Sequence, residues 1–120
     1  MEFPESFIYA GPAFSAPEQP VSAPYFRRQF RLERVPEQAE LLICGIGFYE
    51  LYVNGQRITR GHLAPYISSP DVAVYYDSYD ITPLLKIGEN VLGVWLGNGF
   101  QNNLGGYVWD FDKARFRGAP

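Results

Sequence analysis

The chain has 120 residues, the usual length of one domain, and a chain of this length buries roughly two-thirds of its unfolded surface when it folds. Charged residues make up 19% of the chain and the net charge is −3, so nucleic acid is excluded as the main partner because no basic field exists to hold it. The single cysteine, Cys44, excludes an internal disulfide framework, and we expect it to be a small buried apolar side chain.

The first 24 residues are rich in proline and show little periodicity, so we interpret 1–24 as a leader that runs over the surface. Its start is acidic and has neither the basic nor the apolar region of a signal peptide. A cytoplasmic location is therefore favoured, and a secreted or periplasmic one stays open for a chain whose signal has been removed. The glycine- and asparagine-rich run 91–108 would make a poor membrane helix, so no membrane contact is expected.

Alternating apolar and polar residues predict several short strands separated by turn-forming residues. In one of them Tyr49, Leu51 and Val53 share one face, while Phe48, Glu50 and Tyr52 share the other. We expect strands at 25–34, 39–45, 48–53, 56–59, 72–79 and 91–96.

The dipeptide Asn54-Gly55 separates two of these runs and predicts a β-hairpin. A two-residue type I′ turn needs positive φ at both central positions, and Asn-Gly meets that need at little cost. The hairpin therefore joins 48–53 to 56–59.

The first and last strands raise specific expectations. Arg28 falls on the apolar face of 25–34, where it needs a carboxylate or carbonyl partner or a place at the sheet margin. The strand 91–96 is apolar on both parities, which is typical of a strand covered on both sides. Trp95 is accordingly expected in the core.

One short helical turn is predicted near 83–86, because Thr82-Pro83 is a typical helix start and Gly88 ends the turn. Asp80 is expected to cap it. Short antiparallel strands with no longer helix indicate an all-β fold, a jelly-roll-like β-sandwich. We expect 25–120 to be a single β-sandwich domain and, since it stops abruptly, part of a larger protein.

The acidic residues and the single histidine offer few options for catalysis or metal binding. Asp110 and Asp112 would share one face of a strand and could form a carboxylate pair or bind a hard cation, although solvated surface carboxylates are the commoner arrangement. His62 is the only histidine, so metal sites and catalytic triads that need several histidines cannot be built.

The segment that follows 91–96 concentrates amides and aromatic rings. Sugars bind through aromatic platforms that contact their C–H faces and through amides or carboxylates that bind their hydroxyls. The candidate carbohydrate-binding residues are Asn98, Gln101, Asn102, Asn103, Tyr107, Trp109 and Asp110. The alternative is that this loop packs on a neighbouring domain and buries Trp109 there.

Several motifs together resemble the N-terminal domain of bacterial α-L-rhamnosidases, glycoside hydrolase family 78. No single piece is specific, but the ordered set across 25–100 is. The pieces are Tyr25-Phe26-Arg27-Arg28-Gln29-Phe30, Gly47-Phe48-Tyr49-Glu50-Leu51-Tyr52-Val53-Asn54-Gly55, Leu63-Ala64-Pro65, Tyr79-Asp80-Ile81-Thr82-Pro83-Leu84-Leu85, Gly88-Glu89-Asn90 and Leu96-Gly97-Asn98-Gly99-Phe100.

The resemblance implies a non-catalytic accessory sandwich, whose partners are downstream domains of the same polypeptide, including a helical barrel that carries the catalytic carboxylates. No catalytic residue is carried over to this chain. Some related domains bind rhamnose through Ca²⁺, so a rhamnose-containing glycan and Ca²⁺ are possible ligands, although no cofactor is required. An autonomous carbohydrate-binding module and a structural or interaction sandwich without a ligand remain the alternatives.

Overall fold

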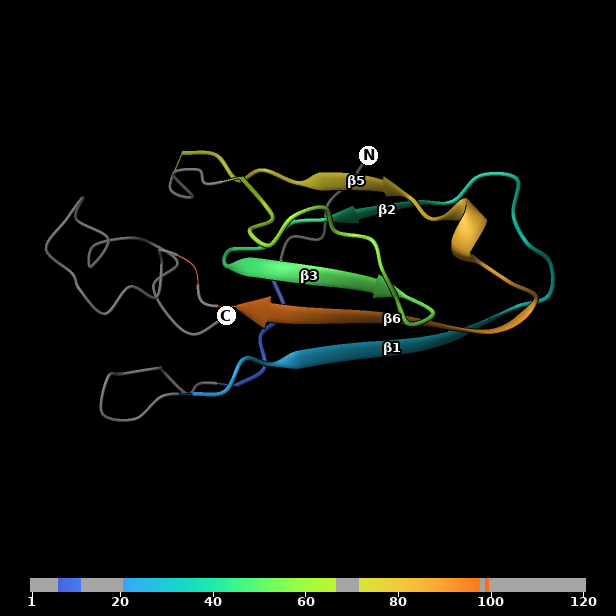
Figure 1. The fold of residues 1–120 in the computed structure, drawn as a ribbon, viewed down its shortest axis with the longest axis horizontal. Helices are drawn as coiled ribbons and strands as arrows, with labels where there is room; N and C mark the ends of the chain where they lie inside the picture. The colour runs from blue at the N-terminus through green and yellow to red at the C-terminus, as the bar shows by residue number, and fades with distance from the viewer. Residues whose placement is uncertain (1–6, 12–20, 67–71, 98, 100–120) are drawn as a thin grey trace, which may run out of the picture.

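The computed structural model describes residues 7–11, 21–66, 72–97 and 99, and in them it contains six strands and one short 3-10 helix (Figure 1). The predicted all-β fold is confirmed. In chain order the elements are β1 (Tyr25–Leu32), β2 (Glu40–Ile43), β3 (Phe48–Val53), β4 (Gln56–Arg57), β5 (Asp77–Asp80), the 3-10 helix η1 (Thr82–Leu84) and β6 (Gly88–Gly97). The helical segment in these ranges is only three residues long and cannot cross a membrane.

The strands form two antiparallel sheets. Four strands lie in the order β1-β6-β3-β4, and β2 pairs with β5 in the second sheet. Tyr49 of β3 links the two sheets, because its hydroxyl donates a hydrogen bond to the carboxylate of Asp77 on β5. This arrangement agrees with the predicted β-sandwich, while its jelly-roll connectivity stays a prediction.

The core lies on the inner face of the four-stranded sheet, between the two layers. Tyr49, Leu51 and Val53 alternate along β3 and are at most 1% exposed, which confirms the predicted alternation. Ile81, just before η1, is also buried. Fully burying an apolar side chain of this size stabilises the fold by roughly 1.5–3 kcal/mol, so β3 is the main contributor to this core.

The β3–β4 hairpin has the predicted turn. Asn54 and Gly55 both have positive φ, 50° and 82°, as a type I′ turn requires. The two-residue turn pairs Val53 with Gln56 and Tyr52 with Arg57. The turn chemistry therefore sets the register in which Arg57 lies beside β3.

The tip of this hairpin is tied to β6 by two asparagine side chains. Asn54 donates a hydrogen bond from its amide nitrogen to the side-chain oxygen of Asn90 (2.9 Å) and another to the carbonyl of Leu84 (2.8 Å). Its side-chain oxygen accepts one from the N–H of Val91 (2.9 Å). The hairpin, the end of η1 and the start of β6 are thereby joined at one point.

Asn90 completes this cluster from inside the protein, where it is 0% exposed. Its oxygen accepts a hydrogen bond from the N–H of Lys86, and its nitrogen donates to the carbonyls of Lys86 and Gly88. All the hydrogen-bonding capacity of a buried amide is used, which is the condition for burying it without a large cost.

The turn before β6 agrees with its prediction. Asp80 accepts a hydrogen bond from the N–H of Thr82 (2.9 Å), the first residue of η1. The N-cap itself is Ile81, which has no side-chain cap, so Asp80 binds the turn from one position before the N-cap, which was the position predicted for it. The Thr82 hydroxyl and that backbone bond lower the pKa of Asp80. The hydroxyl of Thr82 also accepts a hydrogen bond from the N–H of Ala39 (2.8 Å), so the turn is fixed to the segment before β2.

Two predictions about Trp95 and its strand are wrong. Trp95 is 47% exposed and not in the core, so β6 is not covered on both sides. From Val91 onward the strand looks apolar on both parities, but its outward positions there are Val91, Gly93, Trp95 and Gly97, and two of these four are glycines that cover nothing. The polar outward residue of β6, Glu89, precedes the predicted strand 91–96, so that segment lacks the polar residues that usually mark an outer face.

The strand predicted at 72–79 is also wrong in its first part, because β5 begins only at Asp77. In the ladder with β2, Asp77 is paired with Ile43, the last residue of that strand. Apolar residues alone do not make a strand where no neighbouring strand continues the ladder, and 72–76 are exposed.

Two further expectations have clear outcomes. Arg28 is exposed on β1, an edge strand of its sheet, so it lies at the sheet margin as predicted. Cys44 is only partly buried, so the prediction of a small buried apolar side chain is wrong. Burial and the nearby Asp77 carboxylate still raise the pKa of its thiol.

Replacing Asn90 by alanine should strongly destabilise the fold. Asn90→Ala leaves the amide of Asn54 and backbone groups of Lys86 and Gly88 without these partners, so we expect the free energy of unfolding to fall by about 3 kcal/mol. Urea unfolding followed by tryptophan fluorescence measures the change. The control is Glu89→Ala, an exposed neighbour on β6, which should change the stability by less than about 0.5 kcal/mol. Equal stabilities of the two variants would contradict the role of the amide cluster.

Candidate functional site

The carbohydrate-binding residues predicted from the sequence cannot be placed. All of them lie outside the described residues, so the structure defines no distances between them: Asn98, Asn102, Asn103, Tyr107, Trp109 and Asp110. Gln101 and Asp112 also lie outside the described residues. Within the described ranges, no group of three or more His, Cys, Asp or Glu could hold a metal ion. A site must therefore be sought among the residues that the sheet positions.

The outer face of the four-stranded sheet, turned away from β2 and β5, carries such a site. In the antiparallel ladders Trp95 of β6 is paired with Tyr25 of β1 on one side and with Glu50 of β3 on the other. Directly opposed residues project to the same face, so these side chains form a row across the sheet. We call Tyr25, Glu50, Tyr52, Arg57 and Trp95 the outer-face site.

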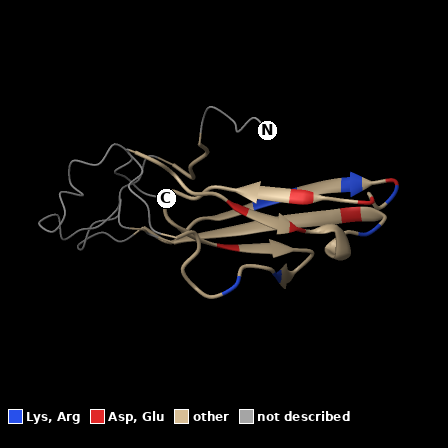
Figure 2. Ribbon diagram, turned by 90° about the horizontal axis from the view of Figure 1, so that it is seen from above, with Lys and Arg blue, Asp and Glu red and all other residues tan. Residues whose placement is uncertain are grey.

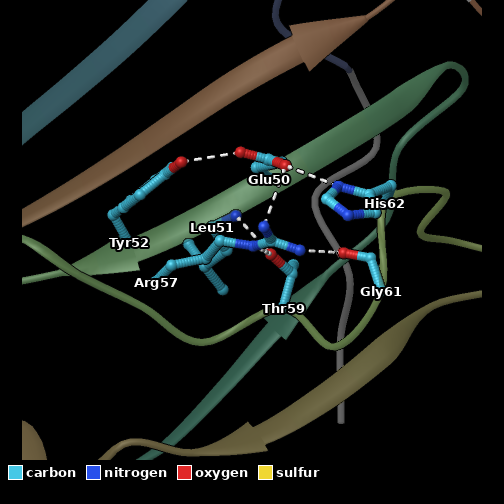
Figure 3. A network of polar contacts seen from close by, with 7 residues as sticks. All are labelled: Glu50, Leu51, Tyr52, Arg57, Thr59, Gly61 and His62. Atoms are coloured by element: carbon cyan, nitrogen blue, oxygen red, sulfur yellow. Dashed lines mark hydrogen bonds and ion pairs between the residues drawn. The ribbon is translucent and has the colours of Figure 1, made fainter.

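Glu50 is the centre of the polar part of this site (Figure 3). The hydroxyl of Tyr52 donates a hydrogen bond to one carboxylate oxygen (2.6 Å), and a guanidinium nitrogen of Arg57 lies 3.4 Å from the other. The Nδ1 atom of His62 lies 3.7 Å from that same oxygen, within ion-pair distance when it is protonated. Three side chains from three segments thus converge on one carboxylate.

Arg57 is itself held in place from the loop that follows β4. Its guanidinium donates hydrogen bonds to the carbonyl of Gly61 and, at 3.4 Å, to the hydroxyl of Thr59. That hydroxyl accepts a further hydrogen bond from the N–H of Leu51 on β3 (3.4 Å), so the loop is fixed to the sheet. The contacts in Figure 3 therefore form one connected network rather than isolated pairs.

The network keeps Glu50 ionised. The Tyr52 hydrogen bond is the largest cause that lowers the pKa of Glu50, and the charge of Arg57 acts in the same direction. The same contact raises the pKa of the Tyr52 phenol, because ionising it would place a second negative charge beside the carboxylate. At neutral pH the site therefore presents a fixed anion and a neutral phenol.

The aromatic part of the site is a tilted pair. The ring centroids of Tyr25 and Trp95 are 6.5 Å apart and their planes meet at 42°. Tyr25 is 60% exposed and Trp95 47% exposed, so both rings present a face to solvent. Large exposed aromatic rings beside oriented polar groups are typical of a contact surface rather than of a core.

A second polar cluster lies between the sheets. Tyr49 donates to Asp77, and the hydroxyls of Tyr49 and Tyr79 are 3.2 Å apart. Burial is the first cause that raises the pKa of Tyr49 well above its ordinary value, so the phenol stays neutral. Since Tyr49 is 1% exposed, we interpret this cluster as a structural bridge between the two layers.

Charge is not concentrated at the outer-face site. Figure 2 shows acidic and basic residues interspersed along the strands and loops of the described part of the chain. A surface with mixed charges lacks the electrostatic potential of a single sign that steers a highly charged ligand. It is better matched to a neutral ligand that is held by short-range contacts.

Sequence reasoning missed the outer-face site, although signals for it exist. The alternation of 48–53 already places Glu50 and Tyr52 on one face. A type I′ turn at Asn54-Gly55 places Arg57 directly opposite Tyr52. His62 comes near Glu50 only through the path of its loop, which no sequence pattern specifies.

Comparisons with known proteins agree on one family. Residues 34–119 match the family described as alpha-L-rhamnosidase N-terminal domain. An alpha-L-rhamnosidase of Formosa agariphila is 43% identical over 88 residues, which are 69% of this chain and 9% of that protein. The chain thus spans about one-tenth of the length of the curated relatives that it matches.

Solved structures show the same similarity in three dimensions. An alpha-L-rhamnosidase from Dictyoglumus thermophilum superposes with a TM-score of 0.62 and 40% identity over 64% of this chain and 9% of that one. The Streptomyces avermitilis alpha-L-rhamnosidase complexed with L-rhamnose gives a TM-score of 0.59 and 33% identity over 65% of this chain and 8% of that one.

The ionisation of Glu50 gives a direct test of the network. We expect Glu50 to titrate below its ordinary value of 4.5, and Tyr52→Phe to move its pKa upward because the strongest hydrogen bond is lost. A ¹³C NMR titration of the Glu50 carboxyl measures both. Tyr66→Phe, which changes an exposed phenol outside the site, is the control and should leave the Glu50 pKa unchanged.

The same shift has a consequence for stability. Because the folded-state pKa is depressed, the contribution of Glu50 is complete above 4.5 and is lost as the pH falls through the folded-state pKa. Wild type should therefore lose more stability than Tyr52→Phe on acidification below 4.5. An identical Glu50 titration in both proteins would contradict the network.

Proposed function

The chain belongs to the alpha-L-rhamnosidase N-terminal domain family, and on that basis we propose that it is the non-catalytic N-terminal sandwich of a larger α-L-rhamnosidase. The parent enzyme would hydrolyse terminal α-L-rhamnosyl residues. The match of residues 34–119 to this family is the observation that carries the proposal. The sandwich would support the catalytic domain and shape its substrate entrance.

The chemistry of the described residues supports a non-catalytic role. Glycoside hydrolysis with inversion needs two carboxyl groups about 6.5–9.5 Å apart, one of which keeps its proton at working pH because its pKa is raised. Glu50 is the carboxylate of the outer-face site, and its pKa is lowered instead. No second carboxylate takes part in its network within the described residues. This carboxylate is suited to accept hydrogen bonds and not to protonate a leaving group.

Length supports the same division of roles. The matched segment is about 9% of the Formosa agariphila relative and 9% of the Dictyoglumus thermophilum chain, so most of each of those proteins lies outside the shared domain. We propose that the catalytic carboxylates belong to the corresponding remainder of a longer polypeptide. Its domains would be the partners of this sandwich, whose strand connectivity we propose to be that of a jelly roll.

Hydrolysis of p-nitrophenyl α-L-rhamnopyranoside tests the proposal. We expect the longer polypeptide to release p-nitrophenol, and the 120-residue chain alone to release none above background. The matched control is Glu50→Gln in the longer polypeptide, which should keep the wild-type kcat because this carboxylate does no chemistry. Hydrolysis by the isolated chain, or its loss on Glu50→Gln with the fold intact, would contradict a non-catalytic role.

A direct contact with carbohydrate is a finer form of the same proposal. The relative from Streptomyces avermitilis was solved in complex with L-rhamnose, which favours rhamnose as the sugar to test. We propose the amide-rich segment as the contact, with Ca²⁺ as an assisting ion, because amide and carboxylate oxygens are the donors that Ca²⁺ prefers. The residues are Asn98, Asn102, Asn103, Tyr107, Trp109 and Asp110.

Calorimetric titration of the 120-residue chain with L-rhamnose tests this contact, with Ca²⁺ and with EGTA. We expect saturable binding with Ca²⁺, and its loss on Asn102→Ala or Trp109→Ala. The matched control is Gln38→Ala, which removes an amide from an exposed position before β2 and should bind as wild type does. Absence of binding up to tens of millimolar would leave the sandwich a structural or interaction domain.

A further inference from the structure

We propose that the outer-face site is a second, metal-independent carbohydrate subsite, in which a neutral sugar ring packs on Trp95. The class of ligand, a rhamnose-bearing glycan, follows from the proposed function, and in this respect the subsite rests on that proposal. Its residues come from β1, β3, β4 and β6, so it is separate from the amide-rich segment that follows β6.

The strand β6 is built to leave the Trp95 ring accessible. On the outer face the positions two residues before and after Trp95 are Gly93 and Gly97, which have no side chain to cover it. The ring is consequently 47% exposed although it lies on a central strand of the sheet. A central strand usually covers its aromatic rings with neighbouring side chains, so this pattern favours a ligand.

The phenol of Tyr25 forms the second wall. Its ring lies against Gly93, where an added Cβ would come within 3.3 Å of the hydroxyl oxygen. The absence of a side chain at this position therefore lets the Tyr25 ring lie over Gly93, with its plane inclined at 42° to that of Trp95. Two inclined aromatic faces can contact the C–H groups on adjoining sides of one sugar ring, because those hydrogens are attracted to the electron-rich faces.

Hydrogen-bonding groups border the two rings. Glu50 is paired with Trp95 in the ladder, is 21% exposed and is held as an anion, so its free lone pairs can accept hydrogen bonds from sugar hydroxyls. On the other side, Arg27 of β1 donates a hydrogen bond to the side-chain oxygen of Gln29 at 3.3 Å, and both side chains are exposed. A ring packed on Trp95 would thus find acceptors on one side and donors on the other.

Aromatic and polar side chains make up almost the whole of this face. Aromatic rings with hydrogen-bonding groups beside them suit a sugar. Tyr, Trp, Phe and Arg are also enriched at protein interfaces, so the Tm of the variants below distinguishes a neighbouring domain from a sugar. On this face the described strands offer a single aliphatic side chain, Val91. By ladder register the others are Tyr25, Arg27, Gln29, Arg31, Phe48, Glu50, Tyr52, Arg57, Glu89 and Trp95, with glycines at 93 and 97.

Affinity electrophoresis of the longer polypeptide tests the subsite. The probe is a polyacrylamide gel that carries S-linked α-L-rhamnosyl groups, which resist hydrolysis, run in EGTA so that a calcium-dependent contact is silent. We expect Trp95→Ala to weaken retention about tenfold, as the loss of a central tryptophan does in other contact sites. Trp109→Ala should retain wild-type affinity under these conditions, and so should Val72→Ala, which changes an exposed residue away from the site.

A second variant distinguishes a loss of sugar binding from an effect on folding. Tyr25→Ala removes the other aromatic wall from an edge strand and should weaken retention about threefold, with an unchanged Tm. Unchanged retention in both variants would overturn the subsite. A lower Tm in both variants with unchanged retention would also overturn it, because the face would then be an interdomain contact.

Catalytic activity separates this inference from the proposed function. The control Val72→Ala, which changes an exposed residue outside the outer-face site, should keep the wild-type kcat for p-nitrophenyl α-L-rhamnopyranoside. If the wild-type polypeptide does not cleave this substrate, the proposed function fails, while gel retention still reports on the outer face. If it cleaves the substrate but Trp95→Ala binds the gel as wild type does, the subsite alone fails.

Discussion

The amide pair of Asn54 and Asn90 is the contact on which the arrangement of the larger sheet depends. It connects the tip of the β3–β4 hairpin to the start of β6, and the backbone bond from the N–H of Asn54 to the carbonyl of Val91 (2.8 Å) lies beside it. These bonds fix Val53 opposite Leu92. A slip of one residue would turn every side chain of a strand to the other face, so the register determines what the protein shows to its surroundings.

The two faces of that sheet follow from this register. On the inner face, Tyr49 reaches the second sheet and closes the core, while on the outer face Glu50 comes to lie beside Trp95. Adjacent residues of β3 thus serve opposite purposes. A neutral phenol joins the layers, and a charged carboxylate is partly exposed to solvent.

Much of this could be predicted from the sequence where the signal is local. The Asn54-Gly55 turn, the alternation along β3 and the short helical turn after Ile81 depend on neighbouring residues, and each is confirmed. The exposure of Trp95 was not predicted, since hydrophobicity cannot tell a covered face from one kept open by glycines. Contacts between distant segments, such as His62 with Glu50, depend on the path of a loop, and no periodic pattern in the sequence indicates them.

The edge of the sheet adds a constraint on how the domain can meet a partner. An edge strand is a template for pairing with other strands, and charged side chains discourage such pairing. Along β1 the arginines at 27, 28 and 31 are all exposed, so a strand approaching this edge would meet several positive charges. Contact through the edge is thereby disfavoured, whereas the outer face keeps its aromatic rings open. A ligand that contacts this sheet would therefore meet the side chains of the outer face, and the polar groups that border Trp95 would determine its specificity.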